Sequence, residues 1–274
     1  MQLVDLEPGN AGLVTPLHQR LGLGGADRLQ SLLASSRARG VCVLDYAGVL
    51  GYATARPWFG RTDLVAVRLT LAREIPSCYL PGLVAAVLSG SGYARALLFP
   101  VKPEHVAQLE EAGWTKFEEL VAYVREPAPL EPARPACEVR PFVPGDLPAV
   151  LEVEHSAFPE LWWAPPGDFL AMAQQSGCTF LVGEKGGSLV GYCSTFWGPG
   201  RPGQVGRLGV HGAHQGRGIG GWLLHQGLVP LAGARVHLNT QVWNDASRHL
   251  YERFGFRVED TTWMMERKLD HAAC

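Results

Sequence analysis

Alternation of hydrophobic and polar residues is clearest in the second half of the chain, between residues 235 and 242. Such alternation predicts a strand with one buried face and one polar face. The buried face would carry Val236, Leu238, Thr240 and Val242, and the polar face would carry His237, Asn239 and Gln241. The next stretch, residues 246–254, has hydrophobic residues four apart, which is typical of an amphipathic helix, and Gly255 is well placed to end it.

The rest of the second half continues this mixture of strands and helices. Asp146 is expected to be the N-cap of a helix, and a hairpin turn is expected at residues 185–188. Predicted strands cover residues 138–140, 179–184, 189–197, 204–210 and part of 256–269, and predicted helices cover 146–157, 167–175 and 219–231. This order predicts an α/β fold in which helices cover a mixed sheet.

The first half repeats this order more weakly. Strands are predicted at residues 41–45, 49–55, 64–71, 93–101 and 117–125, and helices at 81–88 and 104–112. A glycine followed by an aromatic residue ends the last helix of each half, and the two pairs are Gly113-Trp114 and Gly255-Phe256. In this register Leu109 takes the place of Tyr251, and Lys102 takes the place of Asn244. The pattern indicates an internal duplication rather than a short solenoid repeat.

A proline-rich segment, residues 127–135, separates the two halves. Prolines favour an extended spacer, because they restrict the backbone and lack an N–H group. We therefore expect a first domain over residues 1–126, a linker over 127–136 and a second domain over 137–274.

Composition limits the functions of these domains. The 274 residues carry a formal net charge of −2, with 47% hydrophobic and 18% charged residues, which argues against a general nucleic-acid binder. No hydrophobic run approaches a membrane span and no signal peptide is visible, so we expect a cytoplasmic protein without a membrane partner. The six cysteines form no C-x-x-C pair, so we expect reduced cysteines and no metal site.

A glycine-rich loop between a predicted strand and a predicted helix is the main chemical signal. It runs from Gln215 to Gly220 with the sequence QGRGIG. Such a loop points free N–H groups and a helix dipole at one place, which suits a phosphate, although a loop serving only tight packing is the other interpretation. It lacks the Lys of a Walker A loop and the downstream acidic residue of a dinucleotide site. At this place in the first half, residues 73–82 contain two prolines, so no cofactor is expected there.

Further residues stand at fixed spacing around this loop. They are Val210 before it, and Asn244, Ala246, Tyr251, Gly255 and Phe256 after the next predicted strand. With Gln215, Gly218 and Gly220, they resemble the GNAT superfamily of acyl-CoA-dependent N-acetyltransferases. The resemblance covers residues 137–269 and implies two tandem GNAT-like domains, of which the first is a degenerate copy.

The resemblance implies how acetyl-CoA, the co-substrate, is bound. Its pyrophosphate would lie on the N–H groups of Gln215, Gly216, Arg217, Gly218, Ile219 and Gly220. Its pantetheine arm would lie like an extra strand beside Leu208, Gly209 and Val210, and one N–H would polarise the thioester carbonyl. Arg217 is either a charge near the phosphates or a solvated loop residue. Asn244 binds the pantetheine arm, caps the next helix, or does both.

The resemblance also implies direct attack of an amine on the thioester. Tyr251 matches the tyrosine that protonates the leaving thiolate, and a packed aromatic residue is the alternative. The family often supplies a glutamate base on the strand before the loop, but residues 204–210 contain no carboxylate. The substitute candidates, which are otherwise surface residues, are Glu154, His155 and Glu160.

The expected function is transfer of an acetyl group from acetyl-CoA to a primary amine of a small molecule, by a monomer or a homodimer. Three aromatic residues would either wall the acceptor pocket or belong to the core, namely Phe158, Trp162 and Trp163. A non-catalytic acyl-CoA sensor or interaction protein is the alternative, and the missing carboxylate favours it. A protein acetyltransferase would need an acidic acceptor groove, which the Trp-rich loop does not suggest.

Overall fold

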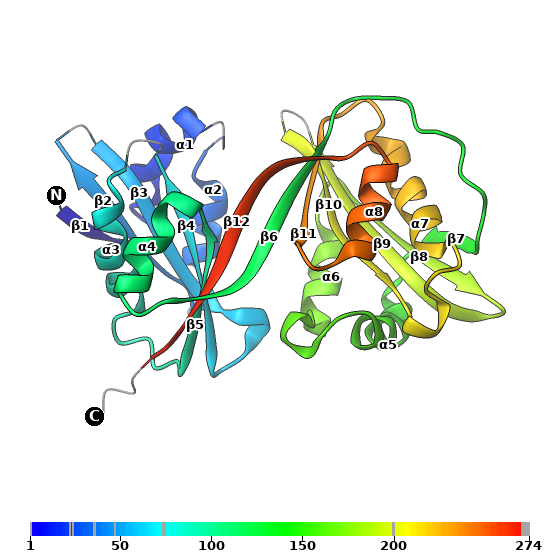
Figure 1. The fold of residues 1–274 in the computed structure, drawn as a ribbon, viewed down its shortest axis with the longest axis horizontal. Coiled ribbons are helices and arrows are strands. Elements are labelled where there is room, and N and C mark those ends of the chain that lie inside the picture. Colours follow the sequence, from blue (N-terminus) through cyan, green and yellow to red (C-terminus); the bar gives the residue numbers. More distant parts are fainter. Residues whose placement is uncertain are drawn as a thin grey trace. The chain divides into compact units, whose positions relative to one another are not determined.

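A computed structural model describes residues 2–21, 23, 25–34, 37–46, 48–72, 75–198 and 201–269. They divide into two units, whose elements are labelled in Figure 1. Unit 1 comprises Met1–Leu120 and Thr261–Cys274, as far as these ranges are described, and unit 2 comprises Val121–Asp260. Within the described ranges, the structure has no helix that is long and apolar enough to cross a membrane.

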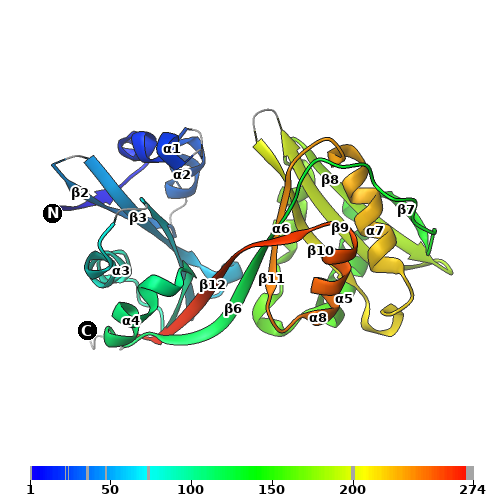
Figure 2. The ribbon, with the colours of Figure 1, turned by 45° about the horizontal axis from the view of Figure 1, so that its top comes forward.

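Unit 1 is a sheet with two helices on each face (Figure 2). Its strands are neighbours in the order β1 (Gln2–Leu6), β2 (Arg39–Asp45), β3 (Gly48–Pro57), β4 (Leu64–Leu71) and β5 (Arg95–Val101). One face carries α1 (Thr15–Leu21) and α2 (Asp27–Leu33), and the other carries α3 (Leu80–Leu88) and α4 (Pro103–Glu111). Strand alternation separates the two faces, because Cys42 packs with α1 and α2 whereas Val41 and Val43 pack with α3.

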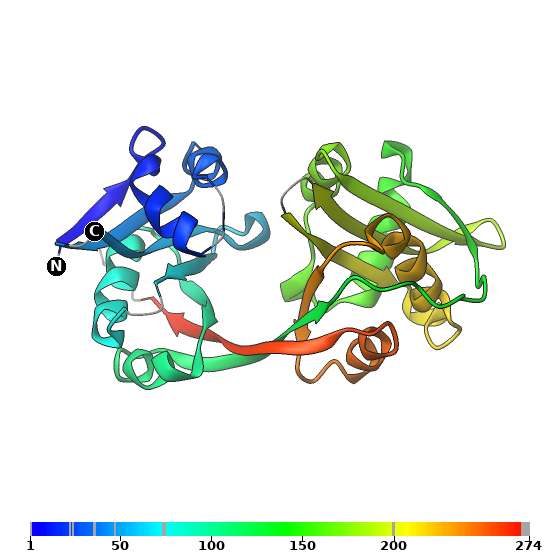
Figure 3. The ribbon, with the colours of Figure 1, turned by 90° about the horizontal axis from the view of Figure 1, so that it is seen from above.

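Unit 2 has the same arrangement (Figure 3). Its strands follow the order β7 (Glu138–Pro141), β8 (Cys178–Lys185), β9 (Ser188–Gly198), β10 (Arg201–Val210) and β11 (Val236–Gln241). One face carries α5 (Leu147–Ala157) and α6 (Pro166–Gln174), and the other carries α7 (Ile219–Leu228) and α8 (Asp245–Arg253). Val205 and Val236 pack with α7 and α8, whereas Arg207 contacts α5 through Glu154.

The order of elements confirms the predicted duplication. In each unit a strand and two helices precede three antiparallel strands, a helix, a parallel strand and a last helix. Gly113 and Gly255 follow α4 and α8 with φ of 83° and 79°. The N–H of the next residue bonds to the carbonyl of Leu109 in unit 1 and of Tyr251 in unit 2, at 3.0 and 3.1 Å. Leu109 thus stands in unit 1 where Tyr251 stands in unit 2.

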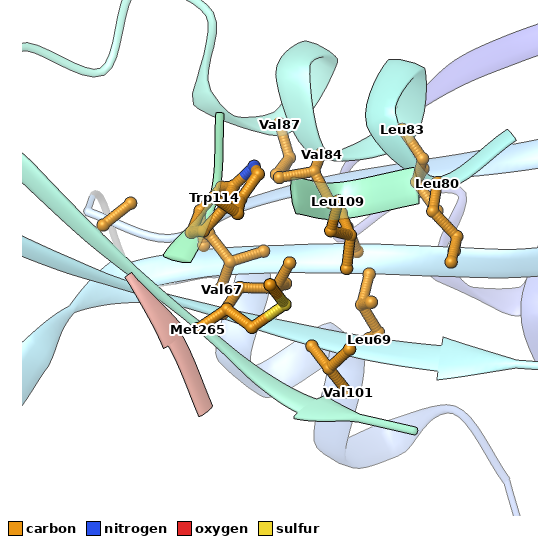
Figure 4. Close-up of a cluster of buried hydrophobic side chains, with 14 of the residues drawn as sticks. Val67, Leu69, Leu80, Leu83, Val84, Val87, Val101, Leu109, Trp114 and Met265 are labelled. Atoms are coloured by element: carbon orange, nitrogen blue, oxygen red, sulfur yellow. The ribbon is translucent and has the colours of Figure 1, made fainter. Parts of the chain in front are cut away.

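Two long strands, β6 (Thr115–Arg125) and β12 (Arg257–Lys268), each contribute to both units. From Thr261 onward β12 belongs to unit 1, where it pairs antiparallel with β5 between Trp263 and Lys268. Met265 of β12 is fully buried in the core of unit 1 beside Trp114 (Figure 4). The division between the units therefore falls inside these two strands, between Leu120 and Val121 and between Asp260 and Thr261, and not at the predicted linker, residues 127–136.

The predicted linker, residues 127–136, contains no helix or strand, in keeping with its prolines. It nevertheless lies against unit 2. The guanidinium of Arg125 donates to the carbonyl oxygens of Ala128 at 2.7 Å and Pro129 at 3.0 Å, and Leu130 packs against the core. The chain therefore passes from unit 1 to unit 2 inside β6, between Leu120 and Val121.

The other differences from the predicted elements are local. The hairpin at residues 185–188 is confirmed, with positive φ at Gly186 and Gly187. Asp146 precedes α5, but its carboxylate caps no helical N–H. It accepts the N–H of Val143 at 2.9 Å and pairs with Arg140 at 2.7 Å instead. The sequence analysis did not predict β1, α1 and α2.

Candidate active site

β10 and β11 are parallel neighbours that pair at only two positions, near the start of each strand. The register contains Gly203 with Val236 and Gln204 with His237, and no later pair joins these strands, which are described throughout. β10 nevertheless continues to Val210 and bulges against β9 between Val205 and Arg207. Its edge toward β11 is therefore open from Val205 to Val210.

The opening in unit 1 is shorter. Its corresponding strands, β4 and β5, pair over five positions, from Leu64 with Arg95 to Arg68 with Phe99, and only the last three residues of β4, Leu69–Leu71, have no partner in β5. Most of the edge of β4 is therefore used within the sheet. Of the segment that replaces the glycine-rich loop here, residues 73 and 74 lie outside the described residues, and Pro81 stands in the first turn of α3.

The glycine-rich loop after β10 presents a set of backbone N–H groups. Gly216 and Gly218 have φ of 71° and 81°, a left-handed conformation that glycine adopts without strain. Gly218 is the N-cap of α7, and its carbonyl accepts the N–H of Trp222 at 3.0 Å. Among the described residues, none accepts a hydrogen bond from the N–H groups of residues 216–221. Free N–H groups at the start of a helix, together with the helix dipole, are an arrangement that suits an anion.

The other predicted residues of this loop support it in different ways. Gln215 offers no free N–H, because that group bonds to the carbonyl of Gly212 at 3.3 Å, and its side-chain amide donates to the carbonyl of Val210 at 3.0 Å. Ile219 is 1% exposed and anchors the start of α7 in the core. Arg217 is exposed. Gly220 lies against β10, since a Cβ there would be 3.4 Å from Val210.

Leu208, Gly209 and Val210 form the part of the open edge nearest the loop. Leu208 and Val210 pack against the core, which fixes the backbone. A Cβ on Gly209 would lie 2.8 Å from the ring of Tyr192, so only glycine allows the strand to pass so close to that ring. Alternate residues of β10 bond to β9, and the others turn their N–H and C=O groups toward the open side. An extended ligand chain can pair with these groups.

Asn244 and Tyr251 lie at α8, on the other side of the opening. The Oδ1 of Asn244 accepts the N–H of Ser247 at 3.2 Å, which confirms the N-cap. Tyr251 is 8% exposed, and its ring centroid lies 6.3 Å from that of Tyr123 and 5.9 Å from that of Phe256. Burial raises the pKa of the Tyr251 hydroxyl above its usual range. The hydroxyl therefore stays protonated at neutral pH and is available as a proton donor.

A buried carboxylate lies on the opposite face of the sheet. Glu154 of α5 is fully buried and pairs with Arg207 of β10, whose Nε donates to Oε2 at 3.0 Å. The hydroxyl of Tyr192 donates to the same oxygen, and the N–H of Ala164 donates to Oε1 at 2.8 Å. The guanidinium of Arg207 also donates to the carbonyl of Trp162 at 2.6 Å. Burial raises the pKa of the Tyr192 hydroxyl well above its usual range, which keeps it a donor.

Comparison with known proteins identifies the family. The model of the acetyltransferase (GNAT) family matches residues 147–256. A mycothiol acetyltransferase of Acidimicrobium ferrooxidans is 30% identical, and the match covers 93% of this chain and 88% of the relative. The chain belongs to the GNAT family. It is an acetyltransferase that transfers an acyl group to an amine.

Other relatives of this GNAT chain match part of it or share the fold. The N-alpha-acetyltransferase RimI of Mycobacterium tuberculosis is 34% identical over 40% of this chain and 70% of its own length. A tandem GNAT protein from the clavulanic acid biosynthesis pathway has a TM-score of 0.71 at 15% identity, covering 97% of this chain and 98% of its own. A GCN5-related N-acetyltransferase from Sphaerobacter thermophilus has a TM-score of 0.69 at 20% identity, covering 97% and 95%. These structures confirm the α/β fold with two tandem GNAT-like domains.

The candidate bases on and after α5 separate into two groups. Glu154 is no surface residue, because its charge is held inside the unit by Arg207 and Tyr192. His155 and Glu160 are exposed, as the surface interpretation predicted. The sequence analysis missed Arg207 and Tyr192, the two partners that bury Glu154.

The three aromatic residues after α5 are partly buried and are engaged by polar neighbours. The guanidinium of Arg207 lies 4.2 Å from the ring centroid of Phe158, and the ring of Trp163 lies 4.2 Å from that of His155. Trp162 ends a 3-10 turn, Glu160–Trp162, and its carbonyl binds Arg207. This loop is therefore fixed to β10 at the start of the open edge. Within the described ranges, no group of three or more His, Cys, Asp or Glu residues could hold a metal ion.

Proposed function

We propose that unit 2 binds acetyl-CoA along the open edge of β10 and at the N–H groups of residues 216–221. The observation that carries this proposal is the combination of the two features in one place. An anion site at the end of β10 suits the pyrophosphate, and an unpaired strand edge that leads away from it suits the amides of the pantetheine arm. Arg217 is close enough in sequence to add charge at the phosphates, and Asn244 caps α8 across the opening.

The transfer follows from this arrangement. An N–H on the open side of β10, near the bulge at Gly206, polarises the thioester carbonyl and stabilises the oxyanion that forms when the amine attacks. The C–N bond forms, the C–S bond breaks, and the electron pair stays on sulfur. Tyr251 then donates its proton to the thiolate. The amine proton must go to a base on the chain or to water.

Unit 1 is proposed to bind no cofactor. Its β4 and β5 pair over five positions, whereas β10 and β11 pair over two, and Leu109 stands in place of Tyr251. Calorimetric titration of acetyl-CoA into the purified chain tests this, and one site per chain is the expected stoichiometry. Two sites per chain would contradict the proposal that unit 1 binds no cofactor. Absence of binding would favour the alternative that the chain is a non-catalytic relative of the family.

The acceptor is proposed to be a primary amine of a small molecule. Support comes from the likeness to a mycothiol acetyltransferase over nearly the whole chain, whereas the likeness to RimI, an N-alpha-acetyltransferase, covers 40% of it. Thiol release from acetyl-CoA with glucosamine, spermidine and a peptide with a free N-terminus separates the two classes. Turnover of the peptide alone would favour the second class. We further propose a cytoplasmic location, where acetyl-CoA is available.

A further inference from the structure

His237 stands where the opening between β10 and β11 begins. It is paired with Gln204, and this pair is the last before the strands separate. A ligand chain that starts at the anion site of residues 216–221 and follows β10 backward must end near this pair, because β11 closes the edge there. If acetyl-CoA binds as proposed above, its thioester end lies next to His237.

The side chain of His237 points to the face on which the acceptor loop lies. Its neighbours Val236 and Leu238 are buried in the core under α7 and α8, so strand alternation directs His237 to the opposite face. That is the face on which Arg207 binds Glu154 and the loop after α5. The His237 side chain is 29% exposed, so a small substrate can reach it.

Glu259 fixes the tautomer of this histidine. The Nδ1 of His237 lies 3.1 Å from the Oε2 of Glu259 on β12, in the part of that strand that belongs to unit 2. A carboxylate only accepts hydrogen bonds, so Nδ1 carries the proton and the lone pair is on Nε2. Glu259 is itself held by Arg235, whose Nη2 lies 2.6 Å from its Oε1.

Two other polar groups on this face, Gln204 and Glu154, are poor proton acceptors. Gln204 carries an amide, which does not accept a proton at neutral pH. Glu154 is fully buried and bound to Arg207, Tyr192 and the N–H of Ala164. A primary amine has a pKa of about 10.4 and arrives mostly as the ammonium ion, so the reaction gains from a base at this point.

We propose that His237, oriented by Glu259, is the general base of the acetyl transfer. The ammonium ion first loses one proton to water, and the neutral amine attacks. Nε2 then accepts the second proton, which the attacking nitrogen loses as the C–N bond forms. The C–S bond breaks with its electron pair on sulfur, and the thiolate takes its proton from Tyr251. His237 then releases its proton to water, and Tyr251 regains one from water, so protons and charge balance over the cycle. This assignment rests on the proposed binding of acetyl-CoA to unit 2.

The pH dependence follows from the groups around His237. These are Glu259 and Arg235, Glu126 at 3.0 Å from Arg235, the neutral Gln204, and the compensated pair of Arg207 and Glu154. Protonation of Nε2 removes the base, so kcat/KM falls on acidification. In a chain without His237, the part of this acidic limb that Nε2 causes should disappear, and only the decrease due to protonation of the amine substrate should remain.

The test compares His237→Gln with His225→Gln, a histidine on α7 that stacks on Trp222 away from the opening. We measure kcat/KM against pH with whichever amine of the three above is turned over fastest, or hydrolysis of acetyl-CoA if none is. His237→Gln is expected to lower kcat/KM about 100-fold and to leave a pH profile that follows the free-amine fraction alone, with acetyl-CoA affinity unchanged. Glu259→Gln should show a smaller loss, and His225→Gln should match wild type.

His237→Ala in the presence of added imidazole keeps the proposal testable if the glutamine variant folds poorly. A catalytic role predicts partial recovery of turnover that increases with imidazole concentration, whereas a structural role predicts none. Retention of kcat/KM within about threefold of wild type in His237→Gln, with the same pH profile, overturns the proposal. Loss of acetyl-CoA binding by wild type would instead contradict the proposed function, so the two failures are distinguishable.

Discussion

Replacement of Glu154 by glutamine should destabilise unit 2 more than any exposed charge change. Glu154 is fully buried, and the side chain of its partner Arg207 is 14% exposed. The glutamine keeps the size and most hydrogen bonds of the carboxylate but leaves the guanidinium without a counter-charge. Loss of one partner from a buried ion pair costs about 3–5 kcal/mol. This is a large part of the roughly 5–15 kcal/mol that stabilises a typical folded protein.

Glu266→Gln is the matched control for this prediction. Glu266 pairs with the Nε of Arg95 at 2.8 Å in unit 1, but their side chains are 20% and 34% exposed. Water screens such a pair, so its loss should cost about 1 kcal/mol or less. Urea unfolding measures the loss of stability in each variant. Amide hydrogen exchange, followed separately in β8–β10 and in β2–β4, shows whether unit 2 or unit 1 has lost that stability. Equal effects of the two substitutions would refute the view that burial of Glu154 sets its contribution.

Two further substitutions test the cofactor site. Gly218→Glu should weaken acetyl-CoA binding at least about 100-fold in calorimetry, because it sets a negative charge at the anion site and forces a side chain onto φ of 81°. Gly90→Glu, at φ of 65° in unit 1, imposes similar backbone strain and should leave affinity unchanged, so an equal loss there would point to strain alone. Tyr251→Phe should lower kcat by about 100-fold or less, because a thiol near pKa ~8.5 leaves fairly well unaided. Because the pKa of the Tyr251 hydroxyl is raised, the wild-type chain should keep this proton donor in alkaline solution. Deprotonation of Tyr251 near neutral pH, with a parallel fall in the wild-type kcat, would count against the assignment.

The glycine-rich loop could be predicted from the sequence because its signals are local. Glycines at positions of positive φ, the strand before them and the helix after them lie within a short stretch, and the structure has all three. The match of Gly113 with Gly255 likewise depended on the two residues at a helix end. Such features follow from backbone geometry, which a short sequence determines.

The buried charge of Glu154 was missed because its partners are far away in the chain. Arg207 and Tyr192 are separated from it by 53 and 38 positions, and only the folded sheet brings them together. One local signal was available. Val150, Val153 and Glu154 are spaced as one face of a helix, and the structure buries all three. A carboxylate on a buried helical face predicts a partner, although it does not say which residue that partner is.

The route of β12 has a consequence for the order in which the chain can fold during synthesis. Met265 is needed in the core of unit 1, yet more than a hundred residues of unit 2 are made between Trp114 and Met265. On the ribosome, unit 1 therefore waits with an incomplete sheet edge at β5 until the end of the chain emerges. Unit 2 has all of its residues, Val121–Asp260, earlier and can form first, although it comes second in the gene.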